Sequence, residues 1–126
     1  MKKILLVEDD PLSAMVLGDF LEANGFAVTI AKNGVDALTQ FELVSPDAML
    51  VDVMIPKRSG FEVCFEVKRT EKGRKMPVIL MSAVYRDHDH AHKYARDDLR
   101  AEAYLVKPFD MKAMLVELES LLARAA

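Results

Sequence analysis

Polar and charged side chains stand at the ends of four apolar runs in this sequence, and they are the residues that could do chemistry. They are Glu8, Asp9 and Asp10 after the first run, Asp52 towards the end of another, and then Ser82 and Lys107. Two carboxylates about 5 Å apart repel by roughly 3 kcal/mol at an effective dielectric constant of about 20, so a cluster of them favours a divalent cation. A few oxygen ligands on rigid strand ends suit Mg²⁺, which keeps several of its waters. The set therefore predicts a Mg²⁺ site with one ammonium and one hydroxyl group beside it.

Asp52 is the candidate nucleophile of this set. It lies in the apolar run 48–56, and because Pro56 cannot donate to a sheet, the strand should end close to Asp52. Reactive groups of open parallel sheets gather at that edge. There the metal and Lys107 would neutralise phosphoryl oxygens, Ser82 would donate to one of them, and Asp52 would form an acyl phosphate. Each residue alone has an ordinary explanation as a strand end, turn or cap, but their joint occurrence favours phosphoryl transfer to a carboxylate.

Apolar periodicity places these residues on a framework of alternating strands and helices. Short apolar runs predict strands at 4–7, 26–30, around Asp52, 78–81 and 103–106. Helical spacing predicts helices at 11–24, 35–45, 61–68, 85–99 and 111–122, with Asp10 as the first N-cap and 71–75 as a charged loop. This order predicts an α/β fold of the (βα)5 type, in which a doubly wound, five-stranded parallel sheet is covered on both faces.

Length and composition fit one soluble globular domain spanning residues 1–126. The chain has 52% hydrophobic and 29% charged residues and a formal net charge of −3, which argues against direct nucleic-acid binding. No apolar run is long enough for a membrane span and the N-terminal run is too short for a signal peptide, so the expected location is cytoplasmic. Cys64, the single cysteine, is expected to be a small core residue on the helix face that also holds Phe61, Phe65 and Lys68.

These motifs resemble, over the entire chain, the receiver domain of two-component response regulators, the CheY-like family. The stretch 6–11 is similar to the family's acidic loop, and the resemblance implies that Glu8 and Asp9 are the paired acids and Asp9 a direct Mg²⁺ ligand. Asp52 within 51–56 resembles the phosphoacceptor, with the backbone carbonyl of Met54 as a further metal ligand. The resemblance also implies a flavodoxin-like strand order of 2-1-3-4-5.

The second half of the chain carries the rest of the resemblance. Ser82-Ala83 is similar to the family's hydroxyl residue and the small residue after it, and Lys107-Pro108-Phe109 to its lysine followed by a cis peptide bond. Tyr104 resembles the aromatic switch. It is expected to point outward near the fourth helix and to turn inward when Ser82 moves towards a phosphoryl group on Asp52.

The resemblance implies a signalling switch that is not a turnover enzyme. Asp52 would take a phosphoryl group from a histidine kinase or phosphotransfer protein in a Mg²⁺-dependent reaction, and the domain assists its own phosphorylation and dephosphorylation. The change would alter a surface read by a downstream effector protein or domain, with a phosphorylation-dependent dimer as one form of output. Whether the chain acts alone or as the receiver part of a longer regulator is left open.

The sequence departs from the family pattern between Ser82 and Lys107. This interval is longer than usual, and a Gly-Ala-Asp-Asp type of lead is replaced by 100–103, so the glycine that most easily ends a helix gives way to Arg100. A thin apolar stripe of Ala91, Ala95 and Leu99 predicts a poorly packed segment at 88–99. Its three histidines, His88, His90 and His92, form a weak candidate metal site, because on a helix only the first and third share a face.

Three alternatives are a degenerate receiver, a phosphatase and a flavin-binding protein of similar topology. A degenerate receiver, acting as a constitutive interaction module, fits the unusual region before Arg100 but not the presence of all the acids, Ser82 and Lys107. An aspartyl-phosphate phosphatase would carry its nucleophile after the first strand, whereas the candidate here is Asp52 in the third. A flavin phosphate would meet acidic side chains at 8–10 where it needs bare backbone N–H groups.

Overall fold

Five parallel strands form one sheet in the computed structural model of the protein, which describes residues 1–83 and 93–125. The strands are β1 (Lys3–Val7), β2 (Ala27–Ala31), β3 (Ala48–Asp52), β4 (Val78–Ser82) and β5 (Ala103–Val106). Their order is β2-β1-β3-β4-β5, as the family resemblance implied, and the expected doubly wound α/β fold is confirmed. The second strand starts one residue later than predicted.

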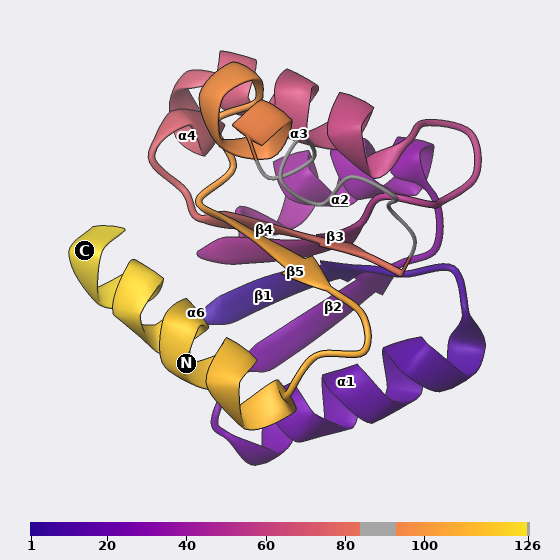
Figure 1. Cartoon of the computed structure of the whole chain (residues 1–126), viewed down its shortest axis with the longest axis vertical. Coiled ribbons are helices and arrows are strands. Elements are labelled where there is room, and N and C mark those ends of the chain that lie inside the picture. The colour runs from indigo at the N-terminus through magenta and orange to yellow at the C-terminus, as the bar shows by residue number, and fades with distance from the viewer. Residues whose placement is uncertain (84–92, 126) are drawn as a thin grey trace.

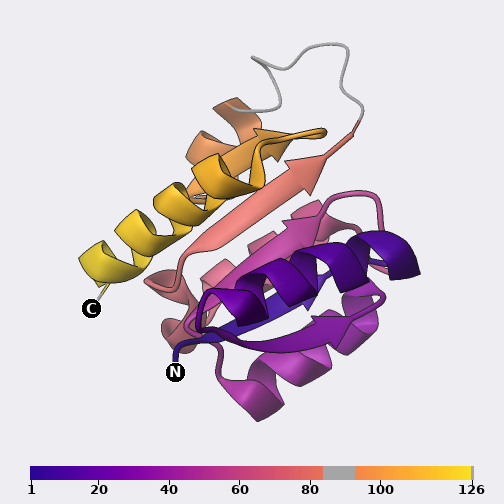
Figure 2. The same ribbon diagram turned by 90° about the horizontal axis from the view of Figure 1, so that it is seen from below.

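Helices cover both faces of this sheet (Figure 1). The first and last, α1 (Pro11–Ala23) and α6 (Met111–Ala125), lie together on one face, as the view from below also shows (Figure 2). The other face carries α2 (Gly34–Val44), α3 (Gly60–Arg69), the short α4 (Glu71–Arg74) and a π-helical turn, η1 (Tyr94–Asp98). The sheet is therefore buried between two helical layers.

Side chains of the central strands alternate between two apolar cores. In β1, Leu5 and Val7 pack with the helices α2 and α3, while Ile4 and Leu6 pack with α1 and α6. Because both faces are covered, the central strands are apolar along nearly their whole length. A polar side chain on these strands is consequently confined to their ends, which is where the site lies.

Capping residues fix where the helices begin. Asp10 caps α1, since its carboxylate accepts hydrogen bonds from Ser13 N at 3.0 Å and from Ser13 Oγ at 2.6 Å. Ser59 and Glu62 form a reciprocal capping box at the start of α3. Asn33 caps α2, because its side-chain oxygen accepts a hydrogen bond from the backbone N–H of Asp36. The helices therefore start at defined residues just beyond the strand ends.

The charged segment 71–75 is not a loop, and this part of the sequence prediction was wrong. Residues Glu71–Arg74 form α4, and the hydroxyl oxygen of Thr70 caps it by accepting a hydrogen bond from Gly73 N at 2.9 Å. Gly73 lies so close to α3 that an added Cβ would sit 2.1 Å from Val67 O. The segment was predicted to be a loop because most of its residues are charged, although Thr70 is a common type of N-cap residue.

The predicted fourth helix is described only in its last part, where the chain forms η1 instead of an α-helix. Ala95 and Leu99 are only 1% and 4% exposed, so the prediction of a poorly packed segment at 88–99 was wrong for these two residues. Ala91 and the three histidines lie outside the described residues. Arg100 adopts a left-handed backbone with φ 61°. The segment therefore has, after η1, the left-handed residue that is usually a glycine where a helix ends.

Arg100→Gly is expected to raise the free energy of unfolding by roughly 0.5–1 kcal/mol. A side chain in the left-handed region costs about 1–2 kcal/mol, part of which is offset by the greater freedom of glycine in the unfolded chain. Urea unfolding of both proteins measures the difference. Arg96→Gly in η1 is the control and should be destabilising, because Arg96 lies in helical backbone. A destabilised Arg100→Gly variant would mean that the arginine side chain outweighs its backbone strain.

Cys64 is fully buried in the core between α3 and the sheet, so its predicted structural role is confirmed. Burial raises the pKa of its thiol from 9.0 to about 12. Between these values the unfolded thiol has lost its proton and the folded one has not, so Cys64 should make the protein less stable as pH rises, by roughly 1.4 kcal/mol per pH unit. Urea unfolding at pH 9 and 10 should show a steeper loss for the unmodified protein than for Cys64→Ala. If the stability of both proteins fell equally between pH 9 and pH 10, the pKa of Cys64 would not be raised by burial.

Candidate functional site

Two neighbouring strands bring the acidic residues to one edge of the sheet. Asp52 is the last residue of β3, and Glu8 directly follows β1. The strands are aligned so that Val7 pairs with Val51, one residue before each acid. The backbone N–H of Glu8 donates to Ala31 O at 3.0 Å, which holds the acidic loop along β2. The strand register therefore sets the spacing between the two acids.

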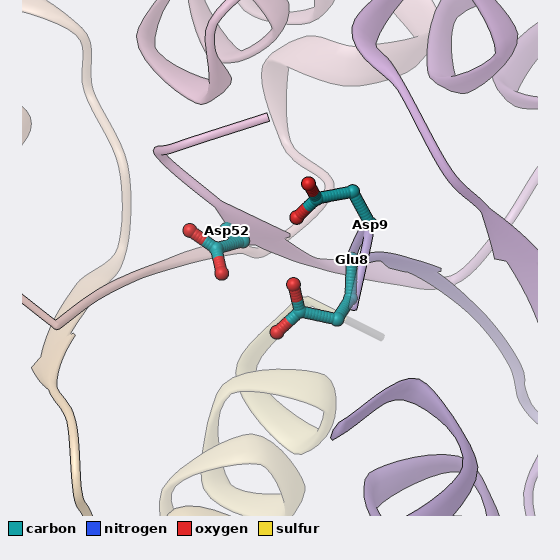
Figure 3. Close-up of side chains that lie close together, drawn as sticks. All are labelled: Glu8, Asp9 and Asp52. Carbon is teal, nitrogen blue, oxygen red and sulfur yellow. The ribbon is translucent and has the colours of Figure 1, made fainter. Parts of the chain in front are cut away.

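The carboxylates of Glu8, Asp9 and Asp52 face one another (Figure 3). One oxygen from each lies within 4.8 Å of the others. The residues Glu8 and Asp52 are only 2% and 7% exposed, whereas Asp9 is exposed. The structure thus brings together the three acids predicted from sequence, with two of them in the protein interior and one at the solvent boundary.

Lys107 lies between the two buried acids. Its ammonium donates to Glu8 Oε1 at 2.6 Å and to Asp52 Oδ2 at 2.7 Å. Its backbone N–H donates to Ser82 O at 2.8 Å, so the residue after β5 remains fixed to β4. The peptide bond from Lys107 to Pro108 is cis, as the resemblance implied. The single ammonium of Lys107 therefore forms ion pairs with two carboxylates, and the site keeps a net negative charge.

The pKa values of these groups reflect their burial and pairing. Burial raises the pKa of Glu8, the ammonium of Lys107 opposes this, and the charge of Asp52 adds to it. Burial would lower the pKa of Lys107, but hydrogen bonds to Asp52 and Glu8 outweigh it and the pKa is raised. Lys107 is consequently held in its charged form, with its ammonium available to an anion at Asp52.

Asp10 and Met54 have narrower roles in the geometry. Asp10 is the cap of α1 and does not belong to the acidic cluster, as expected. Met54 donates its backbone N–H to Asp52 Oδ1 at 2.8 Å, which orients the carboxylate. This hydrogen bond was not predicted from sequence; its signal is only that Met54 follows the strand end by two residues. The ligand role of the Met54 carbonyl stays a prediction.

Ser82 and Tyr104 are both buried. Ser82 is the last residue of β4, is 1% exposed and pairs with Val106 of β5. Tyr104 was expected to point outward, and this was wrong: the residue is 7% exposed and belongs to the core that contains Ala95 and Leu99. The reason is that η1 and the residues after it cover this face of β5, which the sequence pattern treated as loosely packed.

The three acids are chemically suited to Mg²⁺. They offer hard oxygen ligands from one compact cluster, and the exposed Asp9 leaves room for the waters that Mg²⁺ retains. Among the described residues the cluster holds only carboxylates, and the thiol of Cys64 is buried elsewhere, in the core against α3. The cluster therefore fits a Mg²⁺ ion better than zinc or copper.

The strand order and the acids, hydroxyl and lysine at the carboxyl edge of the sheet agree with the class of receiver domains. A profile of the family described as "Response regulator receiver domain" matches residues 4–119, and the chain belongs to this family. The cluster of Glu8, Asp9 and Asp52 fits the phosphoacceptor site of the family.

Relatives and solved structures agree with this assignment. The DNA-binding dual master transcriptional regulator RpaA from Synechocystis is 33% identical over 98% of this chain and 50% of its own length. The response regulator MprA from Mycobacterium avium is 36% identical over 97% of this chain and 51% of its own. The chain thus spans about half the length of these curated relatives.

A solved structure adds information about the site. The receiver domain of the sensor histidine kinase PA1611 from Pseudomonas aeruginosa is 29% identical, with a TM-score of 0.86 over 97% of this chain and 98% of that one. Its structure holds a magnesium ion coordinated in the active-site cleft.

Within the described part of our chain, no helix has the length and apolar character needed to cross a membrane.

Proposed function

We propose that Asp52 accepts a phosphoryl group and that the domain is a switch controlled by this modification. An oxygen of Asp52 attacks the phosphorus of a phosphohistidine, the new P–O bond forms as the P–N bond breaks, and the imidazole leaves with the electron pair. The observation that carries the proposal is the position of Lys107, whose ammonium contacts both Asp52 and Glu8. This ammonium can follow the negative charge as it passes to the phosphoryl oxygens.

The other residues have supporting roles in this proposal. Glu8, Asp9, Asp52 and the carbonyl of Met54 would hold Mg²⁺, which neutralises charge on the phosphoryl oxygens when bound. Ser82 supplies a hydroxyl from the end of β4. The N–H of Met54 keeps the Asp52 carboxylate oriented towards the acidic loop. We assign no turnover to the domain, since Asp52 is itself the acceptor.

The direct test is covalent modification of Asp52. Incubation with acetyl phosphate or phosphoramidate and Mg²⁺ should add the mass of one phosphoryl group, and Asp52→Asn should abolish the gain. Asp47→Asn is a matched control, because Asp47 is outside the cluster and accepts a hydrogen bond from Lys3 N. An unmodified protein under these conditions, or modification that persists in Asp52→Asn, would overturn the proposal.

Mg²⁺ is expected to stabilise the fold, since it relieves repulsion within the acidic cluster. At a hundred times its dissociation constant it should add about 2.7 kcal/mol to the free energy of unfolding. Thermal unfolding at increasing Mg²⁺ measures the shift, and removal of the ion with EDTA should reverse it. Asp9→Asn should weaken the response, whereas Asp19→Asn on the exposed face of α1 should not. Unfolding curves that are indifferent to Mg²⁺ would count against the site.

The partners we propose follow from the same chemistry. A histidine kinase or phosphotransfer protein supplies the phosphoryl group in the cytoplasm, and an effector protein or domain reads the altered surface. Phosphorylated Asp52 carries about −1.5 to −2 charge, which attracts the hydroxyl of Ser82. Tyr104 lies in the same core as Ala95 of η1. We propose that movement of Ser82 shifts Tyr104 and so changes the packing beneath η1. We treat residues 1–126 as one receiver domain.

The degenerate-receiver alternative lacks a supporting observation. Such a module would be expected to have lost one of the site's acids or its lysine, whereas Glu8, Asp9, Asp52 and Lys107 converge at one edge of the sheet. Among residues 1–83 and 93–125, no feature therefore favours a phosphorylation-independent interaction module over the switch.

A further inference from the structure

One face of α3 contacts the chain segment that leads into β5. Three side chains make the contacts, and each meets a residue further along that segment. The rings of Phe61 and Tyr94 meet edge to face with centroids 5.3 Å apart. The spacing of the three α3 residues, 61, 64 and 68, is that of a single helical stripe, so α3 and the segment 94–102 run alongside each other.

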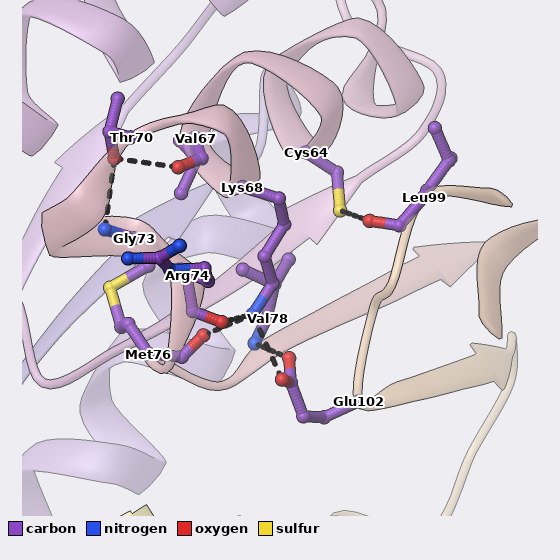
Figure 4. Close-up of polar contacts among 10 residues, drawn as sticks. All are labelled: Cys64, Val67, Lys68, Thr70, Gly73, Arg74, Met76, Val78, Leu99 and Glu102. Carbon is purple, nitrogen blue, oxygen red and sulfur yellow. Dashed lines mark hydrogen bonds and ion pairs between the residues drawn. The ribbon is translucent and has the colours of Figure 1, made fainter. Parts of the chain in front are cut away.

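The second and third contacts hold the connector, defined here as residues 99–102 (Figure 4). The thiol of Cys64 donates to Leu99 O at 3.6 Å. The ammonium of Lys68 forms an ion pair with Glu102 Oε2 at 2.9 Å. The connector is thus fixed to α3 at both of its ends, on either side of the left-handed Arg100.

The ammonium of Lys68 is buried, and hydrogen bonds to its neighbours compensate for the loss of water. The Lys68 side chain is 5% exposed, and its ammonium also donates to Met76 O at 2.6 Å. The other oxygen of Glu102 accepts a hydrogen bond from the backbone N–H of Val78 at 2.8 Å. One carboxylate therefore ties α3 to the start of both β4 and β5, at the opposite end of these strands from the acidic cluster.

The other end of α3 rests on the backbone of the phosphoacceptor. Gly60 N donates to Val53 O at 2.9 Å, and a Cβ on Gly60 would lie 2.4 Å from Asp52 O. The capping box of Ser59 and Glu62 fixes the first turn of the helix immediately beside this contact. A helix of 10 residues is about 15 Å long, so α3 joins Asp52 to the connector as a single rigid element.

We propose that α3 transmits the state of Asp52 to the connector, and through it to the surface around η1. A change in the loop after Asp52 displaces the first turn of α3, and the stripe of Phe61, Cys64 and Lys68 passes that displacement to residues 94–102. This inference rests on the proposed phosphorylation of Asp52. It adds a second route of output beside Ser82 and Tyr104, with Lys68 as the positioning residue of the connector.

The test follows backbone amides by NMR with beryllofluoride and Mg²⁺ as the phosphoryl mimic. In the unmodified protein, the amides of Met54, Leu99 and Glu102 should all shift. In Glu102→Gln, which keeps an acceptor for Val78 N, the shifts of Leu99 and Ala101 should fall at least two-fold while that of Met54 is unchanged. Adding Cys64→Ala should reduce the connector shifts further.

Glu42→Gln is the matched control, because Glu42 pairs with Lys72 on the surface and does not contact the connector. It should leave every shift unchanged. Connector shifts that persist in full in Glu102→Gln and in the double variant would overturn the α3 route. So would an unmodified protein in which Met54 responds and the connector does not. A Met54 amide that fails to respond would instead overturn the phosphorylation of Asp52 and, with it, this inference.

Discussion

Lys68→Met is expected to lower the free energy of unfolding by roughly 2–4 kcal/mol. Removing one partner of a buried ion pair usually costs about 3–5 kcal/mol, and the Glu102 side chain that stays behind is 28% exposed, so water screens part of its charge. The variant leaves Glu102 without its counter-charge and Met76 O without its donor. Methionine fills much of the space of the lysine stem, so lost packing contributes little. Urea unfolding measures the change against the unmodified protein.

A surface lysine provides the control for this result. Lys72 pairs with Glu42 at 3.9 Å on the exposed side of α4, and Lys72→Met should cost no more than about 1 kcal/mol. Adding Glu102→Gln to Lys68→Met should restore part of the loss, because the uncompensated charge disappears while Val78 N keeps an acceptor. A loss below 1 kcal/mol for Lys68→Met would show that water replaces the ammonium freely.

Lys107→Met is expected to have the second large effect, a loss of about 2–3 kcal/mol in Mg²⁺-free buffer. Glu8 and Asp52 would then face each other without the ammonium that contacts both. The figure lies at or below the lower end of the cost for a fully buried pair because the site is open to water on the side of Lys107, whose side chain is 24% exposed. Calorimetric or urea unfolding, with and without Mg²⁺, measures it.

Mg²⁺ should distinguish this mechanism from a simple packing defect. The ion supplies positive charge to the same carboxylates, so it should stabilise Lys107→Met more than it stabilises the unmodified protein. Lys112→Met, in an exposed position of α6, should behave like the unmodified protein. Phosphorylation of Lys107→Met should also be slow even with Mg²⁺ present. If Lys107→Met is as stable as Lys112→Met in EDTA, Lys107 does not offset the negative charge of Glu8 and Asp52.

The sequence allowed the strands and the site residues to be predicted because their signals are local. Apolar runs that end in Glu8, Asp52, Ser82 and Lys107 show both where the strands stop and which side chains stand there. The strand order did not follow from these runs and came from the family resemblance. The pairing of one ammonium with two acids was also beyond the pattern, since it depends on strand register.

The errors have physical causes in long-range packing. Tyr104 looked exposed because nothing local shows that η1 covers β5. Lys68 was placed correctly on a face with Cys64, but its partner Glu102 is 34 residues away and no spacing rule connects them. Periodicity also overstated burial, because Phe65 was placed on the same face of the helix as Cys64 and is nevertheless 48% exposed.

The unequal exposure of the three acids bears on how fast the site can exchange its ion. Glu8 and Asp52 are enclosed, whereas Asp9 stands at the solvent boundary, so the cluster is open on one side in the folded protein. An ion can therefore enter and leave past Asp9 without any opening of the sheet or its helices. Exchange should be limited by the slow loss of water from Mg²⁺ and not by unfolding. Mg²⁺ occupancy would then follow changes in its free concentration much faster than the protein folds or unfolds.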